Sequence, residues 1–465
     1  PVTAHRTSPT NIGLALLSNL AAYDFGYITM SEMVSRCSNT LKTLHKMERY
    51  KGHFYNWYDT LSLSVMPPAY VSTVDSGNLV GHLLILRQGI LGLKSNPIFN
   101  LESYNGIRST VGVLQDLIKN EKDENIENID SLLGDAIREK DYSLSVIKAN
   151  LDDLKVLSDK VALVHENEEA GKWKLKLKNQ IENIREDLYR QIPWLNLLPI
   201  PESFSGLSKL DFNHSLLSLR EMDTGLKEKI DEYKKDTNDG NERNWFDKVK
   251  TALKTGRDFI PEKLNYYEEL AEQLEQLSIV DYDFLLDKDT SHLSIGYNVD
   301  ELRRDNSFYD MLASEARMGI FVGIAQGLLP QKSWFSLGRL LTDSKHGAIL
   351  LSWSGSMFEY LMPQLVMPTY ENTLLYATNI AMVKRQIEYA KQLDVPWGIS
   401  ESGYNSVDAS LNYQYQAFGV PGLGLKRGLE EDLVIAPYAS MMALMVSPDK
   451  ATSNLKYLSE QGFEG

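Results

Sequence analysis

Segments with helical periodicity recur along this chain, and long segments rich in aromatic and turn-forming residues separate them. Apolar residues recur at intervals of three and four in residues 11–26, 31–52 and 76–93, as amphipathic helices require. The segment 51–75 is too long to be a minimal connection between helices, and long loops usually carry function. The alternation predicts an all-α fold of the (α/α) barrel type, in which paired helices form the wall and loops at one end form a cleft.

The charge pattern divides the chain into three parts. Charged residues dominate residues 107–277, which are typical of long solvated helices with a structural role. The aromatic, glycine-rich texture returns after Asp281, with a hairpin predicted at 282–298 and helices at 306–327 and 371–393. We predict one domain over residues 1–465, with 107–277 as a charged helical segment.

Composition excludes several classes of function. The formal net charge of -15 works against binding to nucleic acid, because the phosphate backbone would be repelled. The single cysteine, Cys37, cannot form an intrachain disulfide. No apolar run reaches the roughly 20 residues that a membrane-spanning helix needs, so we expect a soluble domain. The chain begins at Pro1 without Met, and we expect it to be cut from a longer polypeptide.

Motifs for metals and cofactors are weak. The eight histidines are scattered, and the calcium-loop start at Asp287 fails at His292 and Asn298. The segment 398–403 misses the spacing of a nucleophile elbow by one residue, and 422–428 lacks the spacing of a dinucleotide-binding loop. We predict neither a metal nor a cofactor.

The loops combine aromatic rings with hydrogen-bonding side chains, a mixture that fits carbohydrate. The candidate binding residues are Trp57, Tyr58, Asp59, Asp75, Asn78, Trp353, Glu359, Trp397, Tyr404, Asn405, Tyr413 and Tyr415. Glycoside chemistry needs two carboxyl groups in different environments, and four stand out: Asp75, Glu315, Glu359 and Glu401. Any one of them is as readily a structural carboxylate as a catalyst, and the pattern does not choose among them.

Several long motifs carry a family resemblance. They include RTSPTNIGLALLSNLAAYDFGYI, ERYKGHFYNWYDT, YVSTVDSGNLVGHLL, YDMLASEAR, LLSWSGSMFEYLMP, VPWGISESGYN and YQAFGVPGLGLKRGL. Together they resemble the glucoamylase-like transglycosylation domain of cyclic β-1,2-glucan synthases, over residues 5–100 and 281–465. The charged middle segment is similar only in general character.

The resemblance implies a fold, an activity and a setting. We expect an (α/α)6 barrel and an anomer-retaining reaction on linear β-1,2-glucan, in which a glycosyl-enzyme is transferred to a glucan hydroxyl to close a ring. The parent polypeptide would add membrane-embedded glucosyltransferase and phosphorylase-like regions, on the cytoplasmic side of the bacterial inner membrane. This domain itself would bind no nucleic acid and would not insert into the membrane.

The resemblance also implies roles for residues. The SEAR motif makes Glu315 the acid/base, and the GISES motif makes Glu401 the nucleophile. Related enzymes are thought to pass the proton through a substrate hydroxyl, so a Glu315 distant from Glu401 would indicate such a relay. The main alternative is a β-1,2-glucan hydrolase, and the second is a non-catalytic glucan-binding module.

Two finer expectations concern the loops around Glu401. We expect Trp397 to form a sugar platform, and Ser400, Ser402, Tyr404 and Asn405 to hold Glu401 ionised. Transfer instead of hydrolysis requires an acceptor side that excludes water, for which Tyr413, Tyr415 and Phe418 are the candidates.

Overall fold

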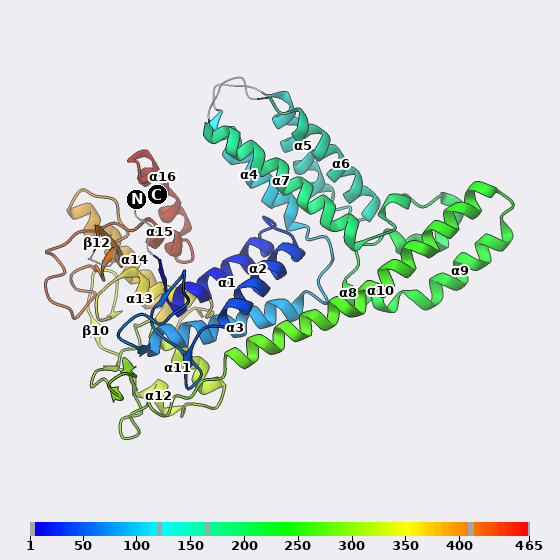
Figure 1. The fold of residues 1–465 in the computed structure, drawn as a ribbon. Helices are drawn as coiled ribbons and strands as arrows, with labels where there is room; N and C mark the ends of the chain where they lie inside the picture. The colour runs from blue at the N-terminus through cyan, green and yellow to red at the C-terminus, as the bar shows by residue number, and fades with distance from the viewer. Residues whose placement is uncertain (1–4, 119–122, 163–167, 408–412, 464–465) are drawn as a thin grey trace. The chain divides into compact units, whose positions relative to one another are not determined.

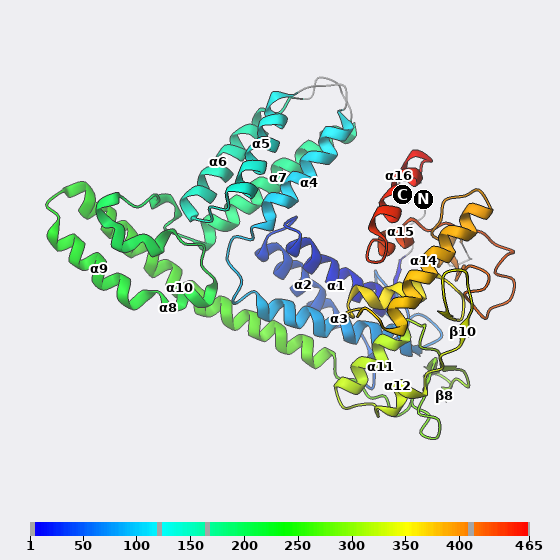
Figure 2. The ribbon, with the colours of Figure 1, turned by 180° about the vertical axis from the view of Figure 1, so that it is seen from behind.

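The computed structural model describes residues 5–118, 123–162, 168–407 and 413–463, with the side chains of 202, 223, 224, 257, 404–407, 413 and 414 outside the description. The chain forms two units (Figures 1 and 2). The first unit contains residues 1–15, 45–85 and 276–465, and the second contains residues 16–44 and 86–275. Three helices contain the points where one unit gives way to the other along the chain: α1 (Pro9–Asp24), α3 (Thr73–Gly92) and α10 (Gly240–Leu277).

The first unit combines short helices with short strands. Its helices are α11 (Ala316–Ala325), α12 (Lys332–Ser336), α13 (Met357–Leu361), η3 (Met362–Leu365), α14 (Leu374–Gln392), α15 (Pro437–Ala443) and α16 (Pro448–Glu460). Helix α13 packs against both α14 and α15, and α15 packs against α16. The loops between these helices are long enough to carry side chains to a common cavity.

Strand pairing joins distant segments of the first unit. The strands are β1 (Arg6–Thr7), β2 (Arg49–Tyr50), β3 (His53–Phe54), β4 (Tyr58–Asp59), β5 (Tyr70–Ser72), β6 (Leu293–Ser294), β7 (Gly296–Asn298), β8 (Arg303–Arg304), β9 (Phe308–Tyr309), β10 (Leu341–Thr342), β11 (Ile349–Leu350), β12 (Ser402–Val407) and β13 (Tyr413–Gln416). All their pairings are antiparallel: β1–β4, β2–β3, β5–β7–β8, β6–β9, β10–β11 and β12–β13. The register that pairs Val71 with Tyr297 fixes the start of α3 against the segment that leads to α11.

The second unit is helical in the part that the structure describes. It contains α2 (Met30–Leu44), α4 (Glu102–Leu117), α5 (Glu124–Glu139), α6 (Leu144–Lys160), α7 (Glu168–Gln191), η1 (Leu195–Leu197), η2 (Glu202–Asp211), α8 (Leu216–Glu221), α9 (Asp223–Asp236) and most of α10. Helices α4 to α7 lie side by side as a bundle (Figures 1 and 2). Its core consists of apolar residues spaced by three and four, such as Ile107, Val111 and Leu114 on α4, so the charged positions face outward.

The prediction of an all-α fold is confirmed, because the chain is mostly helical with few short strands, a composition consistent with an (α/α)6-type barrel. The helices expected at 11–26, 76–93 and 371–393 are present as α1, α3 and α14. That a single domain spans residues 1–465 stays a prediction. Within the described residues, no helix combines the length and the apolar character needed to cross a membrane.

Three local expectations were wrong in their bounds. Helix α2 ends at Leu44 instead of continuing to Gly52, because residues 49–54 pair as β2 and β3. The helix expected at 306–327 begins only at Ala316, since residues 308–309 pair with β6. The hairpin expected at 282–298 contributes β6 and β7 to two different sheets.

Candidate active site

A cavity of about 590 Å³ lies within the first unit, and two predicted catalytic carboxyl groups line it. Glu315 and Glu401 share this wall with Asp75 and with aromatic side chains that include Trp57 and Tyr415. Carboxyl groups beside aromatic faces and hydrogen-bonding groups are the components that a sugar-cleaving site needs.

Glu315 lies at the start of α11, where a buried arginine fixes the turn. The guanidinium of Arg317 donates to the carbonyl oxygens of Ser314 (3.0 Å), Glu359 (3.1 Å) and Tyr360 (2.7 Å). Burial, together with a smaller effect of the neighbouring Glu359 carboxylate, raises the pKa of Glu315 to about 8, against the opposing charge of Arg317. A carboxyl group with this pKa is protonated at neutral pH, as a general acid must be.

Glu359 is buried and bound on several sides by a serine cluster, Ser352, Ser354 and Ser356. Its Oε2 accepts hydrogen bonds from the hydroxyls of Ser352 (2.8 Å) and Ser354 (2.6 Å), and from the amide of Ser354 (3.1 Å). Ser356 caps α13, and its side chain and that of Glu359 form a capping box. Glu359, a predicted binding residue, does not line the cavity, so its position favours an indirect role over direct contact with a sugar.

Glu401 is held by two hydroxyl groups. Its Oε1 accepts from the hydroxyl of Ser356 (3.3 Å), and its Oε2 accepts from the hydroxyl of Tyr415. Burial raises the pKa of Glu401 well above its ordinary value, and the charges of Glu315 and Glu359 add to this effect, while the Ser356 hydrogen bond opposes it. The carboxyl groups of Glu315 and Glu401 therefore titrate as an interacting pair.

The loop that carries Glu401 is anchored on both sides by its backbone. The side chain of Gln386 on α14 donates to the carbonyl oxygen of Ile399 (2.8 Å) and accepts from its amide (3.0 Å). The hydroxyl of Tyr438 donates to the carbonyl oxygen of Glu401 (2.7 Å) and is also hydrogen-bonded to the hydroxyl of Ser400 (2.9 Å). Ser400 thus helps to fix the loop. Within the described residues the hydrogen bonds to the Glu401 carboxyl come from Ser356 and Tyr415, and not from Ser400 as expected.

Another part of the cavity lining is a hydrogen-bonded network around Asp75. Asp75 accepts from the hydroxyls of Thr10 (2.6 Å) and Ser72 (2.7 Å), and the amide of Asn78 donates to Thr10 (3.2 Å). The Oδ1 atom of buried Asn78 has no partner among the described residues, although Asn78 lines the cavity. This atom is therefore available to accept a hydrogen bond from a ligand hydroxyl.

An aromatic face adjoins this network. The guanidinium of Arg6 lies 4.5 Å from the ring centroid of Trp57. The side-chain amide of Asn56 links Asp75 to Trp57. In one of its two orientations its nitrogen donates to Asp75 Oδ2 (3.1 Å) and its oxygen accepts from Trp57 Nε1 (3.1 Å). The indole is thereby fixed in the cavity wall, where its free face can pack against a sugar ring.

The structure brings some predicted binding residues together and leaves others apart. Trp57, Asp75, Asn78 and Tyr415 line the cavity together with the two glutamates. The side chains of Tyr404, Asn405 and Tyr413 lie outside the described residues.

Five predicted binding residues do not line the cavity: Glu359, described above, and Tyr58, Asp59, Trp353 and Trp397. Tyr58 is fully buried, and its hydroxyl donates to the carbonyl oxygen of Glu48 (2.6 Å). Asp59 is used in a turn, where it accepts from the amides of Leu61 and Ser62. Trp397 is 8% exposed and belongs to the core, whereas Trp353 is 63% exposed outside the cavity wall.

Sequence reasoning missed several wall residues. Arg6, Phe358 and Tyr438 line the cavity although they were not named as candidates; Arg6 and Phe358 lie within the motifs that carry the resemblance, whereas Tyr438 lies outside them. Ser356 could have been found, because Ser356 and Glu359 have the spacing of a capping box.

Within the described residues, no group of three or more His, Cys, Asp or Glu side chains is arranged to hold a metal ion.

Replacing Ser356 by Ala is expected to lower the free energy of unfolding by about 0.5–2 kcal/mol, because α13 loses its cap. The pKa of Glu401 is expected to rise further, since the Ser356 hydrogen bond that lowers it is removed. Urea unfolding and an NMR titration of the Glu401 carboxyl carbon measure the two effects. Ser356→Thr keeps the hydroxyl and serves as the control; an alanine variant with unchanged stability and titration would contradict these roles.

Comparison with known proteins agrees with the motifs. Residues 307–464 match the Glycoamylase family model, described as "Putative glucoamylase". Over 473 aligned residues the chain is 35% identical to the cyclic β-(1,2)-glucan synthase NdvB of Rhizobium meliloti (strain 1021); the alignment covers 100% of this chain and 15% of that protein. A solved endo-β-1,2-glucanase from Chitinophaga pinensis, in complex with sophorotriose and glucose, aligns with 98% of this chain and 72% of its own, at a TM-score of 0.49 and 11% identity. The predicted resemblance is confirmed: the chain carries a glycoamylase-like domain and is similar over its whole length to one segment of a cyclic β-(1,2)-glucan synthase.

Proposed function

We propose that this chain is an anomer-retaining transglycosylase that acts on linear β-1,2-glucan and closes it into rings. The observation that carries the proposal is the pair of interacting carboxyl groups, Glu315 and Glu401, in one cavity with Trp57 and the unpaired acceptor of Asn78. The similarity to a cyclic β-(1,2)-glucan synthase supports the choice of glucan linkage.

In the first step, Glu401 would attack the anomeric carbon as the glycosidic bond breaks. Glu315 would give its proton to the departing oxygen, directly or through a substrate hydroxyl. The product of this step is a glycosyl ester on Glu401. The hydrogen bonds from Ser356 and Tyr415 orient the carboxylate before attack and stabilise its charge when it departs again.

In the second step, a glucan hydroxyl would take the place of water. Glu315, now ionised, accepts the proton of this hydroxyl while its oxygen attacks the anomeric carbon and Glu401 is released. When the hydroxyl belongs to the other end of the same chain, the product is a ring. Two inversions at one carbon preserve the β configuration.

Linkage specificity tests the substrate. Incubation with linear β-1,2-, β-1,3- and β-1,4-glucans of similar length, followed by mass spectrometry, is expected to show conversion of the β-1,2-glucan alone. Conversion of another glucan instead would overturn the substrate assignment, and binding of β-1,2-glucan without any conversion would indicate a binding module.

Replacing Tyr415 by Ala is expected to shift the products from rings toward linear fragments. Tyr415 lines the cavity and holds Glu401, so its removal admits water beside the glycosyl ester. Chromatography of the products measures the ratio. Trp353→Ala, which removes an exposed aromatic ring outside the cavity wall, is the matched control. Phe418 is 2% exposed and does not line the cavity, so we do not retain it on the acceptor side.

The setting is part of the proposal. The chain spans 15% of the synthase that it matches, which implies other regions in a larger polypeptide. We propose that these include a glucosyltransferase that supplies linear glucan and a phosphorylase-like region, on the cytoplasmic side of a bacterial inner membrane.

A further inference from the structure

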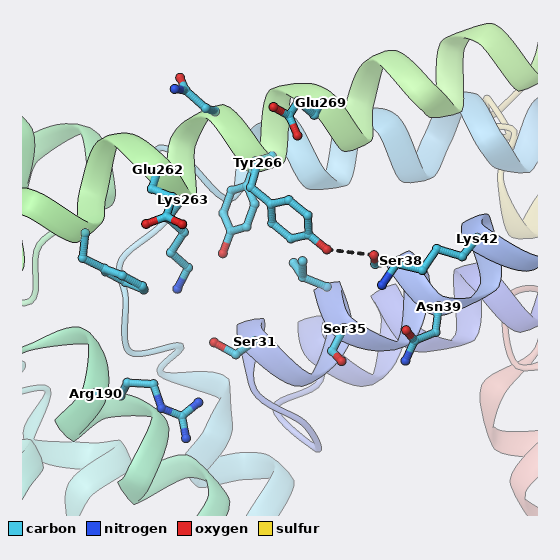
Figure 3. Close-up of a pocket in the computed structure, with 14 residues that line it drawn as sticks. Ser31, Ser35, Ser38, Asn39, Lys42, Arg190, Glu262, Lys263, Tyr266 and Glu269 are labelled. Atoms are coloured by element: carbon cyan, nitrogen blue, oxygen red, sulfur yellow. Dashed lines mark hydrogen bonds between the residues drawn. The ribbon is translucent and has the colours of Figure 1, made fainter.

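A second cavity, of about 680 Å³, lies within the second unit between α2 and α10 (Figure 3). Helix α2 contributes a row of small polar side chains, Ser31, Ser35, Ser38 and Asn39. Helix α10 faces them with the aromatic residues Phe259, Tyr266 and Tyr267. Residues more than 200 positions apart in the sequence thus form one lining.

Much of the polar lining has no partner within the described residues. No hydrogen bond or ion pair there engages the side chains of Ser31, Ser35, Asn39 or Arg190, and the buried hydroxyl of Tyr267 is likewise unpaired. Ser38 on α2 does have a partner, because its hydroxyl accepts a hydrogen bond from the Tyr266 hydroxyl (2.7 Å, Figure 3). Among these groups the Tyr267 hydroxyl is buried, and because a buried polar group is normally hydrogen-bonded, it indicates a polar ligand. Ser35, Asn39 and Arg190 are exposed at the same cavity and can bind such a ligand in place of water.

Two aromatic rings complete the lining. Phe259 is 38% and Tyr266 is 37% exposed, so both present ring surface to solvent at the cavity. Hydroxyls and amides beside exposed rings match a sugar, whose ring has apolar C–H faces and a polar edge.

The charges favour a neutral ligand over an anion. Lys42, Arg190 and Lys263 line the cavity, but Glu262 and Glu269 line it as well. Lys263 is already engaged, because its amino group donates to Gln191 Oε1 (2.7 Å). The cationic and anionic side chains of the lining nearly balance, and together their donors and acceptors can satisfy the hydroxyls of a polyol.

We propose that this cavity is a second binding site for β-1,2-glucan, holding a segment of chain other than the one that reacts. The inference rests on the proposed function for the identity of the sugar. Binding at two cavities would raise the affinity for a long chain, because the second contact becomes intramolecular.

Hydrogen exchange tests each cavity separately. The full chain with Glu401→Gln, which prevents turnover, is incubated with linear β-1,2-glucan. Protection is expected both in peptides from 30–44 and 259–269, which report the second cavity, and in peptides from 73–78 and 399–403, which report the first. Protection of the first cavity alone would overturn the second site and leave the proposed function standing. Protection of the second alone would overturn the function, and protection of neither would overturn both.

A cavity-filling variant separates binding from a general effect on the unit. Asn265 lines the cavity, and Asn265→Trp is expected to abolish protection of 30–44 while 399–403 remains protected. Val156→Trp adds the same side chain at an exposed position of α6 outside the lining and is expected to change neither. Unchanged protection of 30–44 in Asn265→Trp, or equal protection by inorganic phosphate in the unmutated cavity, would overturn a sugar site.

Discussion

Replacing Glu401 by Gln is expected to lower the rate of glucan conversion by about 10³- to 10⁶-fold, the range observed when a nucleophile is removed from an enzyme. Glutamine keeps the size of the side chain and one of the two acceptor oxygens, so one of the hydrogen bonds from Ser356 and Tyr415 can remain and the fold should persist. Initial rates with linear β-1,2-glucan and urea unfolding measure the two properties. If Glu401→Gln lost both activity and folding, the role of Glu401 would be decided by Glu401→Gly with azide.

Removing the carboxyl group entirely makes the role of Glu401 more specific. In Glu401→Gly, azide can enter the vacated space and attack the anomeric carbon, so that activity returns with a glucosyl azide as product. A single displacement inverts the carbon, so this azide should have the α configuration. If azide restored no activity, or if Glu401→Gln retained the full rate, Glu401 would not be the nucleophile.

Replacing Glu315 by Gln is expected to lower the rate by about 10²- to 10⁴-fold, the usual contribution of a general acid. The variant also has a distinct signature in the pH profile. Glu315 must be protonated to act first, and its pKa is raised to about 8, so the rate of the unchanged enzyme should fall as the pH rises through about 8. Glu315→Gln has no proton to lose, and this alkaline decline should disappear.

The acidic side of the pH–rate profile reports the ionisation of Glu401. Glu401 must be ionised to attack, and its pKa is raised by burial and by the charges of Glu315 and Glu359. The rate should therefore rise at a pH above the ordinary range of a glutamate, which is about 4.3. Because the pair titrates together, both limits belong to the pair. A profile that is flat from pH 5 to pH 9 would contradict this electrostatic account.

Sequence patterns predicted local structure where the signals were local. Helix α14 follows the Thr373 cap and carries a regular apolar face, and it was predicted nearly to its ends. Helix α2 was predicted too long, because residues 49–54 pair as β2 and β3 instead of continuing the helix. The helical periodicity of one segment does not show whether its residues pair as strands.

The candidate site was predictable in its carboxyl groups and less so in its walls. The motifs singled out Glu315 and Glu401, and the structure has both in the lining of one cavity, while their catalytic roles stay predictions. Tyr58 and Trp397 have the same composition signal as Trp57, yet they fill the core, because sequence does not reveal which aromatic ring faces a cavity. The hydrogen bond from Thr10 to Asp75 joins residues 65 positions apart, and no local sequence pattern predicts it.

The charged middle segment shows the same limit. Residues 107–277 have the composition of solvated helices, and most of their charges are indeed on exposed faces. The cavity between α2 and α10 arises only when residues 30–44 and 259–269 are brought together in the fold.

The most direct test of transfer is to incubate the protein with linear β-1,2-glucan in H₂¹⁸O and to analyse the products by mass spectrometry. A transglycosylase consumes no water, so the account predicts rings that are lighter than the corresponding linear chains by one water and that contain no ¹⁸O. Linear fragments that carry ¹⁸O at their new reducing ends, without rings, would contradict it and identify the chain as a hydrolase.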